Sequence, residues 1–360
     1  MPRATSPART SRSTADGPLG DRGPRRRSPP DIPPARQQAL IFCTLFNRAY
    51  LPQGLALYRS LERTAGADFV LYILCMDDFS ADALGRLGLG RARIIRLGEF
   101  EDDALRAARA SRTVGEYCWT CTTPLLSYVL DRHPAGEVVT YVDADIRFFS
   151  SPRAILDELG DKSIFIHEHD FGPEYTHFRA VSGRFNVGVV AIRNDPEGRA
   201  CVERWKAQCL ADCSLDPAAG RCGDQNYLDE WPDRYRRLVI SAHPGVGLGP
   251  WNIGKHRLAA DRDGLLVDDL PVVFYHYHAL RVWRPFLGIR PVLMARGDYT
   301  FTSDVVRAIY RPYVHELWQA IAELKAIGSS ILRDLQPMTL EGVGRHLLYR
   351  RQLDFSLGRT

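Results

Sequence analysis

The segment Glu137–Pro152, which reads EVVTYVDADIRFFSSP, constrains the fold more than any other part of the chain. Its apolar run Val138–Val142 is rich in β-branched residues and follows turn-forming residues, which predicts a buried strand. Because side chains alternate in extended backbone, we expect Asp143 and Asp145 to point to one side where the strand ends. Two like charges held together need a cation, and carboxylates suit Mg²⁺, Mn²⁺ or Ca²⁺. On its own, Asp-x-Asp also marks turns and helix caps.

Strand-like and helix-like segments alternate along the chain. Strands are predicted at residues 39–45, 69–76, 92–97, 138–142, 163–167, 185–193, 238–240 and 272–275, and helices at 51–61, 81–87, 117–130, 196–210, 222–232 and around 314–324. This alternation predicts an α/β fold with a doubly wound, mixed but mostly parallel sheet flanked by helices. Such sheets bind ligands at the carboxyl ends of their strands, where Asn47, Asp77 and Asp143 emerge. We expect Asp77 and Asp78 to cap a helix.

The charge of the chain is concentrated at its beginning. Residues 1–36 contain eight arginines and three aspartates, a net charge of +5, so the rest of the chain carries about 4 − 5 = −1. This Pro-, Ser- and Arg-rich segment has few aliphatic residues, which predicts a disordered tail at 1–36. The basic charge lies in the tail alone, so we do not expect nucleic acid as a partner.

No apolar stretch approaches the roughly 20 residues that span a bilayer, and we expect a cytoplasmic protein. The basic and apolar segment Arg345–Arg351 could place it peripherally at the inner face of a membrane. Eight cysteines without a regular framework favour a reducing compartment. Cys118 and Cys121 lack the context of a redox motif, and the later cysteines match no common zinc motif.

Polar residues interrupt two further strand-like segments. Asn186 and Gly188 lie inside the apolar run FNVGVVAIR, where a ligand or a β-bulge would explain them. His276 and His278 are two residues apart in HYHALRVWRPF, so we expect them on one side of an extended segment, as ligands or as core histidines.

Four short motifs follow one another in order. They are NRAYLPQGLALYRSL, YVDADIRFF, FNVGVVAI and GDQNYL. Together they resemble the base loop, the Asp-x-Asp strand, the Phe-Asn-x-Gly-Val run and the Asp-Gln-Asp-x-Leu segment of GT-A nucleotide-sugar glycosyltransferases. Within that fold they are most similar to the retaining family 8 group, which includes glycogenin and bacterial lipooligosaccharide galactosyltransferases. The resemblance implies a GT-A domain at residues 37–290, followed by a C-terminal helical extension at 291–360.

The resemblance also implies a metal site that binds Mn²⁺ or Mg²⁺. The family closes its site with His-x-x-Gly-x-x-Lys-Pro-Trp, and in that register the ligands would be Asp143, Asp145 and His278, with His276 as a competing ligand. Arg284 would replace the lysine that holds the diphosphate, because a guanidinium can form a bidentate contact. Arg281 and Phe286 depart from the family's glycine and tryptophan.

The remaining roles implied by the resemblance concern the donor, which would be a UDP-sugar. Asn47 and Tyr50 would contact the base, and Asp143, Asn186 and Gly188 the rest of the donor. Asp224 and Gln225 would be the catalytic residues nearest the anomeric carbon, although Asp224 could also be a helix cap.

The acceptor would be a carbohydrate, a lipid-linked sugar or a protein, and the sugar would be transferred with retention of configuration. Two alternatives remain at this point. One is a GT-A scaffold without activity that binds carbohydrate or a partner. The other is a sugar nucleotidyltransferase, although the segment CTLFNRAY after the first strand lacks that class's glycine-rich signature.

Overall fold

The computed structural model describes residues 39–262, 264–284, 292–295, 299–328, 330 and 336–337. For residues 283–284, 292–295 and 336–337 it describes the backbone alone. The chain divides into units at 1–37 and 38–360, and all described residues belong to the second. The predicted tail at 1–36 and the basic segment Arg345–Arg351 lie outside the described residues.

The largest sheet among the described residues has seven strands in the order β10-β6-β7-β4-β1-β2-β3. These strands are β1 (Leu40–Phe46), β2 (Phe69–Cys75), β3 (Ala92–Arg96), β4 (Val138–Val142), β6 (Ile164–Glu168), β7 (Phe185–Arg193) and β10 (Leu238–Ile240). All neighbours pair in parallel except β7, which is antiparallel to both β4 and β6. The predicted class, an α/β fold with a mixed, mostly parallel sheet, is confirmed.

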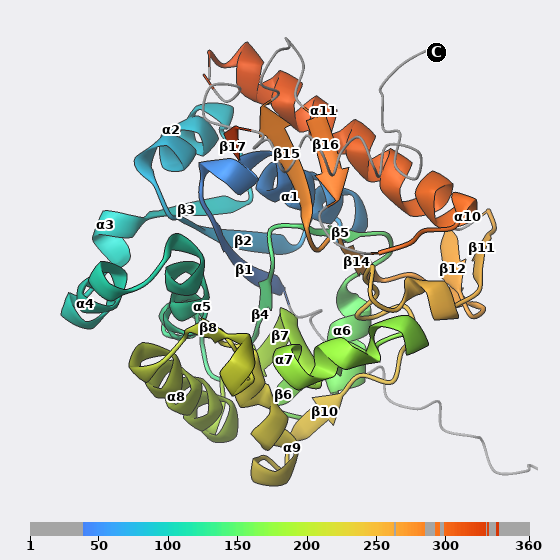
Figure 1. The fold of residues 1–360 in the computed structure, drawn as a ribbon. Coiled ribbons are helices and arrows are strands. Elements are labelled where there is room, and N and C mark those ends of the chain that lie inside the picture. Colours follow the sequence, from blue (N-terminus) through green and yellow to red (C-terminus); the bar gives the residue numbers. More distant parts are fainter. Residues whose placement is uncertain are drawn as a thin grey trace, which may run out of the picture. The chain divides into compact units, whose positions relative to one another are not determined.

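Helices cover both faces of this sheet (Figure 1). Buried residues of α1, α2, α6 and α11 share one hydrophobic core, and those of α4, α5, α8 and α9 share the other. The helices are α1 (Leu51–Thr64), α2 (Asp78–Leu87), α3 (Leu97–Phe100), α4 (Asp103–Ser111), α5 (Val114–Leu130), α6 (Arg153–Leu159), α7 (Arg179–Ser182), α8 (Pro196–Ala211), α9 (Trp231–Arg234), α10 (Ser303–Val305) and α11 (Arg311–Ala326). No helix in this part of the chain is both long and apolar enough to cross a membrane.

One edge of the sheet collects the polar residues that the sequence singles out. The carboxyl ends of β1, β2, β4 and β6 meet there because these strands run in the same direction. Strand β7 runs the opposite way, so its beginning lies at the same edge. Asn47, Asp77, Asp143, His169 and Asn186 therefore come from five strand ends to one edge.

A separate pair of antiparallel strands, β5 (Ile146–Phe148) and β14 (Phe274–His276), follows the aspartates. Arg147 of this pair forms a bidentate hydrogen bond with Glu316 of α11, at 2.9–3.0 Å. Directly after β14, the ring of Tyr277 stacks on Tyr313 with centroids 3.6 Å apart. Helix α11 thus packs against the β5–β14 pair, and it also packs against α1 (Figure 1).

Shorter strands complete the described fold. They are β8 (Leu215–Asp216), β9 (Arg221–Cys222), β11 (Leu258–Ala260), β12 (Leu265–Val267), β13 (Leu270–Pro271), β15 (Leu280–Arg284), β16 (Val292–Ala295) and β17 (Gln336–Pro337).

The predicted helix at 222–232 is wrong in its first half. Cys222 belongs to β9, and a 3₁₀ helix, η4 (Asn226–Glu230), begins only after the turn at Gly223, whose φ is +59°. A left-handed residue cannot open a right-handed helix, and the turn displaces the helix toward the carboxyl end.

Candidate active site

Asp143 and Asp145 lie in a tight turn between β4 and β5 rather than in extended backbone. The carbonyl of Asp143 accepts a hydrogen bond from the amide of Ile146 at 3.2 Å, which closes the turn. The amide of Asp143 donates to the carbonyl of Gly188 at 2.9 Å, and the Tyr141 hydroxyl donates to Asp143 Oδ1 at 2.9 Å. The expected pairing of the two carboxylates is confirmed, but a turn produces it, not strand alternation.

The third member of this cluster is His276. Its Nε2 lies 3.1 Å from Asp145 Oδ1 and 3.7 Å from Asp143 Oδ2, and the three donor atoms lie within 4.8 Å of one another. The pairing of β14 with β5 places His276 opposite Ile146, directly after the turn. Two carboxylates and one imidazole form a donor set that suits Mn²⁺, so these residues fit a divalent cation.

The charges of the cluster depend on one another. Burial raises the pKa of the Asp143 carboxyl, and the negative charge of Asp145 adds to that rise. Burial also disfavours charge on Asp145, but the charge and hydrogen bond of His276 hold the pKa of that carboxyl below its usual value. For the same reason, the two carboxylates raise the pKa of His276 in spite of its burial. The cluster therefore binds a positive charge, whether on the imidazole or on a cation.

His276 replaces His278 as the candidate third ligand. Strand β14 ends at His276, and His278 lies in the turn that follows, which the Leu280 amide closes by donating to the Tyr277 carbonyl at 3.0 Å and in which Ala279 has a φ of +64°. His278 therefore does not share the direction of His276. The side chain of His278 is exposed, and its ring packs against Trp251 with centroids 5.8 Å apart. When the family's closing motif is counted from His276, its glycine falls on Ala279, in the left-handed conformation that favours glycine.

Asn186 connects the cluster to Gln225. Its Nδ2 donates to Gln225 Oε1 at 3.1 Å and contacts His169 Nε2 at 3.1 Å. Its Oδ1 accepts from the amide of Gly188 at 2.9 Å and lies 3.3 Å from His276 Nδ1. Nearly all of the hydrogen-bonding capacity of this buried amide is therefore used within the protein.

The glycine at position 188 is required by the packing of the site. A Cβ atom there would lie 2.5 Å from Asn186 Oδ1 and 2.7 Å from His276 Nδ1. Both distances are shorter than nonbonded contact allows. The sequence left a ligand and a β-bulge as explanations of this glycine, and the structure adds the close approach of two side chains of the site.

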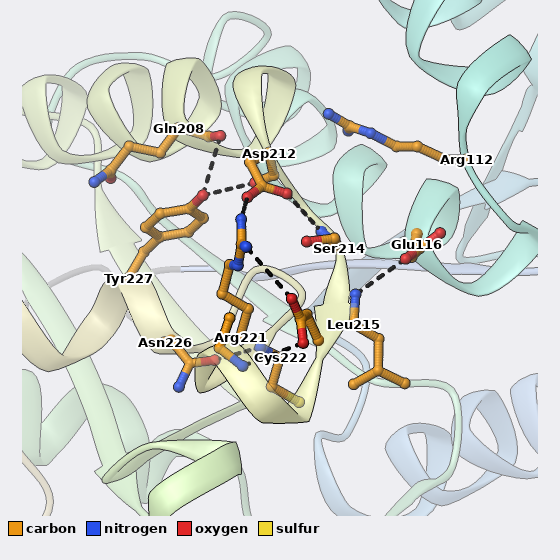
Figure 2. Close-up of polar contacts among 12 residues, drawn as sticks. Arg112, Glu116, Gln208, Asp212, Ser214, Leu215, Arg221, Cys222, Asn226 and Tyr227 are labelled. Carbon is orange, nitrogen blue, oxygen red and sulfur yellow. Dashed lines mark hydrogen bonds and ion pairs between the residues drawn. The ribbon is translucent and has the colours of Figure 1, made fainter.

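The segment that carries Asp224 and Gln225 leaves the β8–β9 hairpin, which Figure 2 shows in detail. The Tyr227 hydroxyl donates to the carbonyl of Asp212 at 2.6 Å, and Arg221 forms ion pairs with Asp212 and Asp216. Leu215 is tied to α5 through its amide, which donates to Glu116 at 3.0 Å (Figure 2). These contacts fix both ends of the hairpin.

Asp224 itself is almost fully buried, beside Thr122 of α5 and Asp143. Burial, followed by the negative charge of Asp143, raises the pKa of the Asp224 carboxyl to about 8. Its carbonyl accepts a hydrogen bond from the buried indole of Trp205 at 2.9 Å. Asp224 is not a helix cap, because Gln225 occupies the position that precedes η4.

The residues expected near the base have structural partners of their own. Asn47 caps the 3₁₀ helix η1 (Arg48–Tyr50) by accepting a hydrogen bond from the amide of Ala49 at 3.0 Å. The ring of half-buried Tyr50 carries the guanidinium of Arg281 over its face at 4.3 Å. Asp77 caps α2, as predicted.

Two further expectations can be compared with the structure. The side chain of Arg284 lies outside the described residues, as does Phe286. All eight cysteines are free, and no cysteine belongs to a group of possible metal ligands in the described part of the chain. Burial raises the pKa of the Cys118 thiol to about 12, so it is protonated at neutral pH.

Three residues of the site were missed by sequence reasoning. Tyr141 precedes Asp143 by two positions, and strand alternation could have found it. His169 and Trp251 come from separate loops and meet beside His276, with ring centroids 5.2 Å apart. No local pattern marks these two residues.

No model of a known protein family matches the chain. Among solved structures, it is similar to the galactosyltransferase LgtC in complex with donor and acceptor sugar analogs, at 14% identity and a TM-score of 0.46 over 87% of this chain and 100% of that chain. It is also similar to mouse xyloside xylosyltransferase 1, at 15% identity and a TM-score of 0.43 over 67% of this chain and 98% of that chain.

Two proteins of Bacillus subtilis (strain 168) match most of the chain. The uncharacterized protein YfnD is 27% identical over 79% of this chain and 91% of its own length. The uncharacterized protein YfnF is 31% identical over 77% of this chain and 90% of its own length. At that identity and coverage, the chain belongs to the same protein family as YfnF.

Proposed function

We propose that the protein is a metal-dependent glycosyltransferase that moves a sugar from a nucleotide-sugar, a UDP-sugar in the first instance, to an acceptor with retention of configuration. The observation that carries the proposal is the grouping of Asp143, Asp145 and His276 at the carboxyl edge of the sheet. The four motifs that resemble GT-A glycosyltransferases surround this cluster in the sequence and supply its neighbours in the fold.

Asp143, Asp145 and His276 would hold Mn²⁺ or Mg²⁺. A divalent ion bound there would neutralise the charge that develops on a departing nucleoside diphosphate. The cluster is suited to this role because its two carboxylates already require a positive charge nearby.

Asn186 and Gly188 shape the site from β7. In this proposal the side chain of Asn186 orients both His276 and Gln225. Asn186 contacts the donor only through the hydrogen-bonding capacity that these contacts leave unused. Gly188 leaves room for the imidazole, because any larger residue would displace it.

Gln225 and Asp224 would face the donor sugar. The amide of Gln225 is oriented by Asn186 and by the carbonyl of Ser182, to which its Nε2 donates at 2.7 Å. Asp224 lies beside Asp143, so it is close to the place where the diphosphate would bind. We therefore assign the two residues to the stabilisation of the anomeric centre.

The proposal is tested by the response of the melting temperature to Mn²⁺ together with UDP. A ligand present at a hundred times its Kd stabilises a protein by about 2.7 kcal/mol, which is a readily measured shift. We expect this shift in the wild type and its loss in Asp145→Ala. The control is Asp78→Ala, which removes a highly exposed carboxylate of α2 and should keep the full shift.

Activity is tested separately by screening UDP-sugars for Mn²⁺-dependent hydrolysis. Turnover by the wild type and its loss in Asp145→Ala are expected. An undiminished shift in Asp145→Ala would contradict the assigned site. A normal shift without turnover of any UDP-sugar would instead favour the scaffold without activity.

A further inference from the structure

A third group of aromatic side chains adjoins the candidate metal site and belongs to neither hydrophobic core. We call it the aromatic platform, and it comprises His169, Phe171, Tyr175, Phe178, Trp251, His278 and Tyr299. Ring contacts run through it without a break from the metal site outward. Trp251 begins the series, with its centroid 5.4 Å from that of His276.

The platform combines buried, half-buried and exposed rings. Trp251 and His169 are buried, Phe171 and Phe178 are half-buried, and His278 is exposed. The rings of His169 and Phe171 stack at 4.6 Å and 10°, and those of Phe171 and Phe178 lie 6.4 Å apart. The partly exposed rings of Phe171 and Phe178 are thus connected through His169 and Trp251 to the candidate metal site.

Strained backbone shapes both sides of this surface. Asp170 lies between His169 and Phe171 with a φ of +50°, and Ala279 follows His278 with a φ of +64°. Non-glycine residues adopt this conformation at a cost, and such residues concentrate at functional sites. The chain turns at Asp170, so that His169 is buried and Phe171 stacks on it. Asp170 also forms an ion pair with Lys255.

The inner end of the platform contains two buried nitrogen atoms without a partner among the described residues. Trp251 Nε1 is one of them. The other is Nδ1 of His169, which carries the ring proton because Nε2 faces the amide donor of Asn186. Buried N–H groups of this kind are destabilising unless an acceptor meets them.

We propose that the aromatic platform binds a sugar residue of a carbohydrate acceptor. This inference rests on the proposed glycosyltransferase function and specifies the acceptor class. The face of an aromatic ring is electron-rich and attracts the polarised C–H bonds of a pyranose, and sugar hydroxyls supply the acceptors that Trp251 and His169 lack.

An acyl chain is the less suitable occupant. None of the seven platform residues is aliphatic. Asp170 and Glu174, which have exposed carboxylates, lie between platform residues in the sequence. Charged groups next to a hydrocarbon chain would lose hydration without compensation, whereas they can accept hydrogen bonds from sugar hydroxyls.

The test uses saturation-transfer NMR on the full chain with two kinds of probe. The methyl glycosides of glucose, galactose and mannose represent the sugar, and decyl phosphate represents a lipid. We expect saturation of the glycoside ring protons by the wild type. Phe178→Ala should weaken glycoside binding about fivefold to tenfold, as expected for the loss of one stacking face.

The matched control is Tyr128→Ala, which removes another half-buried aromatic side chain, on α5, and should bind the glycosides as the wild type does. Each sample is measured with and without Mn²⁺ and UDP, and the melting temperature reports donor binding independently. Glycoside binding that is absent, or equal in wild type and Phe178→Ala, overturns the proposal. Binding of decyl phosphate alone also overturns it. If the melting temperature did not respond to Mn²⁺ and UDP but the glycosides bound normally, the proposed donor site would be contradicted and the sugar-binding role of the platform would stand.

Discussion

The two sides of the segment Phe274–Tyr277, which consists of strand β14 and the residue that follows it, are both buried but have opposite chemistry. On one side His276 meets two carboxylates and the amide of Asn186. On the other side Tyr275 and Tyr277 pack among the rings of Tyr310 and Tyr313. The first side carries negative charge that a cation would compensate. The second side is closely packed and requires no ligand. Alternate residues of one short segment thus serve stability and ligand binding separately.

The largest expected effect is on the aromatic side. Tyr277 is fully buried, stacks on Tyr313 and donates a hydrogen bond to the carbonyl of Ile309 at 2.9 Å. We expect Tyr277→Ala to lower the free energy of unfolding by about 3 to 5 kcal/mol, as for other large core truncations. Urea unfolding in the presence of EDTA measures it.

Tyr277→Phe is the control for this variant, because it removes the hydroxyl and keeps the ring. Its expected loss is about 1 kcal/mol. If the alanine and phenylalanine variants were equally stable, packing would not be what holds this side of β14.

A second prediction concerns a buried histidine for which the described residues supply no carboxylate partner. His167 packs against Phe274, two residues before His276, with ring centroids 5.5 Å apart. Burial lowers the pKa of His167 from 6.5 to about 4, whereas the carboxylates raise the pKa of His276. The unfolded chain therefore takes up a proton at His167 before the folded chain does.

The stability contributed by neutral His167 is complete above pH 6.5 and is lost as the pH falls toward 4. The loss at this residue is at most about 3 kcal/mol. Urea unfolding at several pH values between 7 and 4.5 should show a smaller decline for His167→Gln than for the wild type. Parallel declines would mean that burial does not keep this imidazole neutral.

The third prediction concerns the charged side. Gly188→Ala introduces a methyl group 2.5 Å from Asn186 Oδ1, and we expect a loss of about 1 to 3 kcal/mol. The same variant should lose the response of the melting temperature to Mn²⁺ and UDP, because the methyl group displaces His276. Gly115→Ala, at an open position of α5, should keep both properties. A normal Mn²⁺ response in Gly188→Ala would show that the position of His276 is not critical.

Much of the sheet could be predicted from the sequence, because its strands are short apolar runs bounded by turns. The run Phe185–Arg193 was located to the residue, but its antiparallel direction depends on pairing with β4 and β6, which no local pattern encodes. The predicted helix from Cys222 failed because Gly223 is left-handed and lies against Trp119, where a Cβ atom would be 2.7 Å from the indole, and no local pattern reveals this distant neighbour.

The candidate site was predicted in part. The Asp-x-Asp motif located two of the three proposed ligands. Choosing between His276 and His278 required knowledge of where β14 ends and of the turn at Ala279. Asn47 has the expected position but serves as a helix cap. The aromatic platform could not have been foreseen, because Trp251, His278 and Tyr299 come from segments distant from the one at 169–178 that supplies its other rings.

The hydrogen bonds between Arg147 and Glu316 join residues that are 169 positions apart. A ribosome adds roughly 5 to 20 residues per second, so on the order of ten seconds separate the synthesis of the two aspartates from that of Glu316. Until His276 is added, the nascent chain carries both carboxylates without the histidine that accompanies them, and until α11 is complete it lacks the helix that supports their strand. A transcript broken just before the codon for His276 would therefore give a polypeptide with all seven strands of the large sheet and an unfinished cation site.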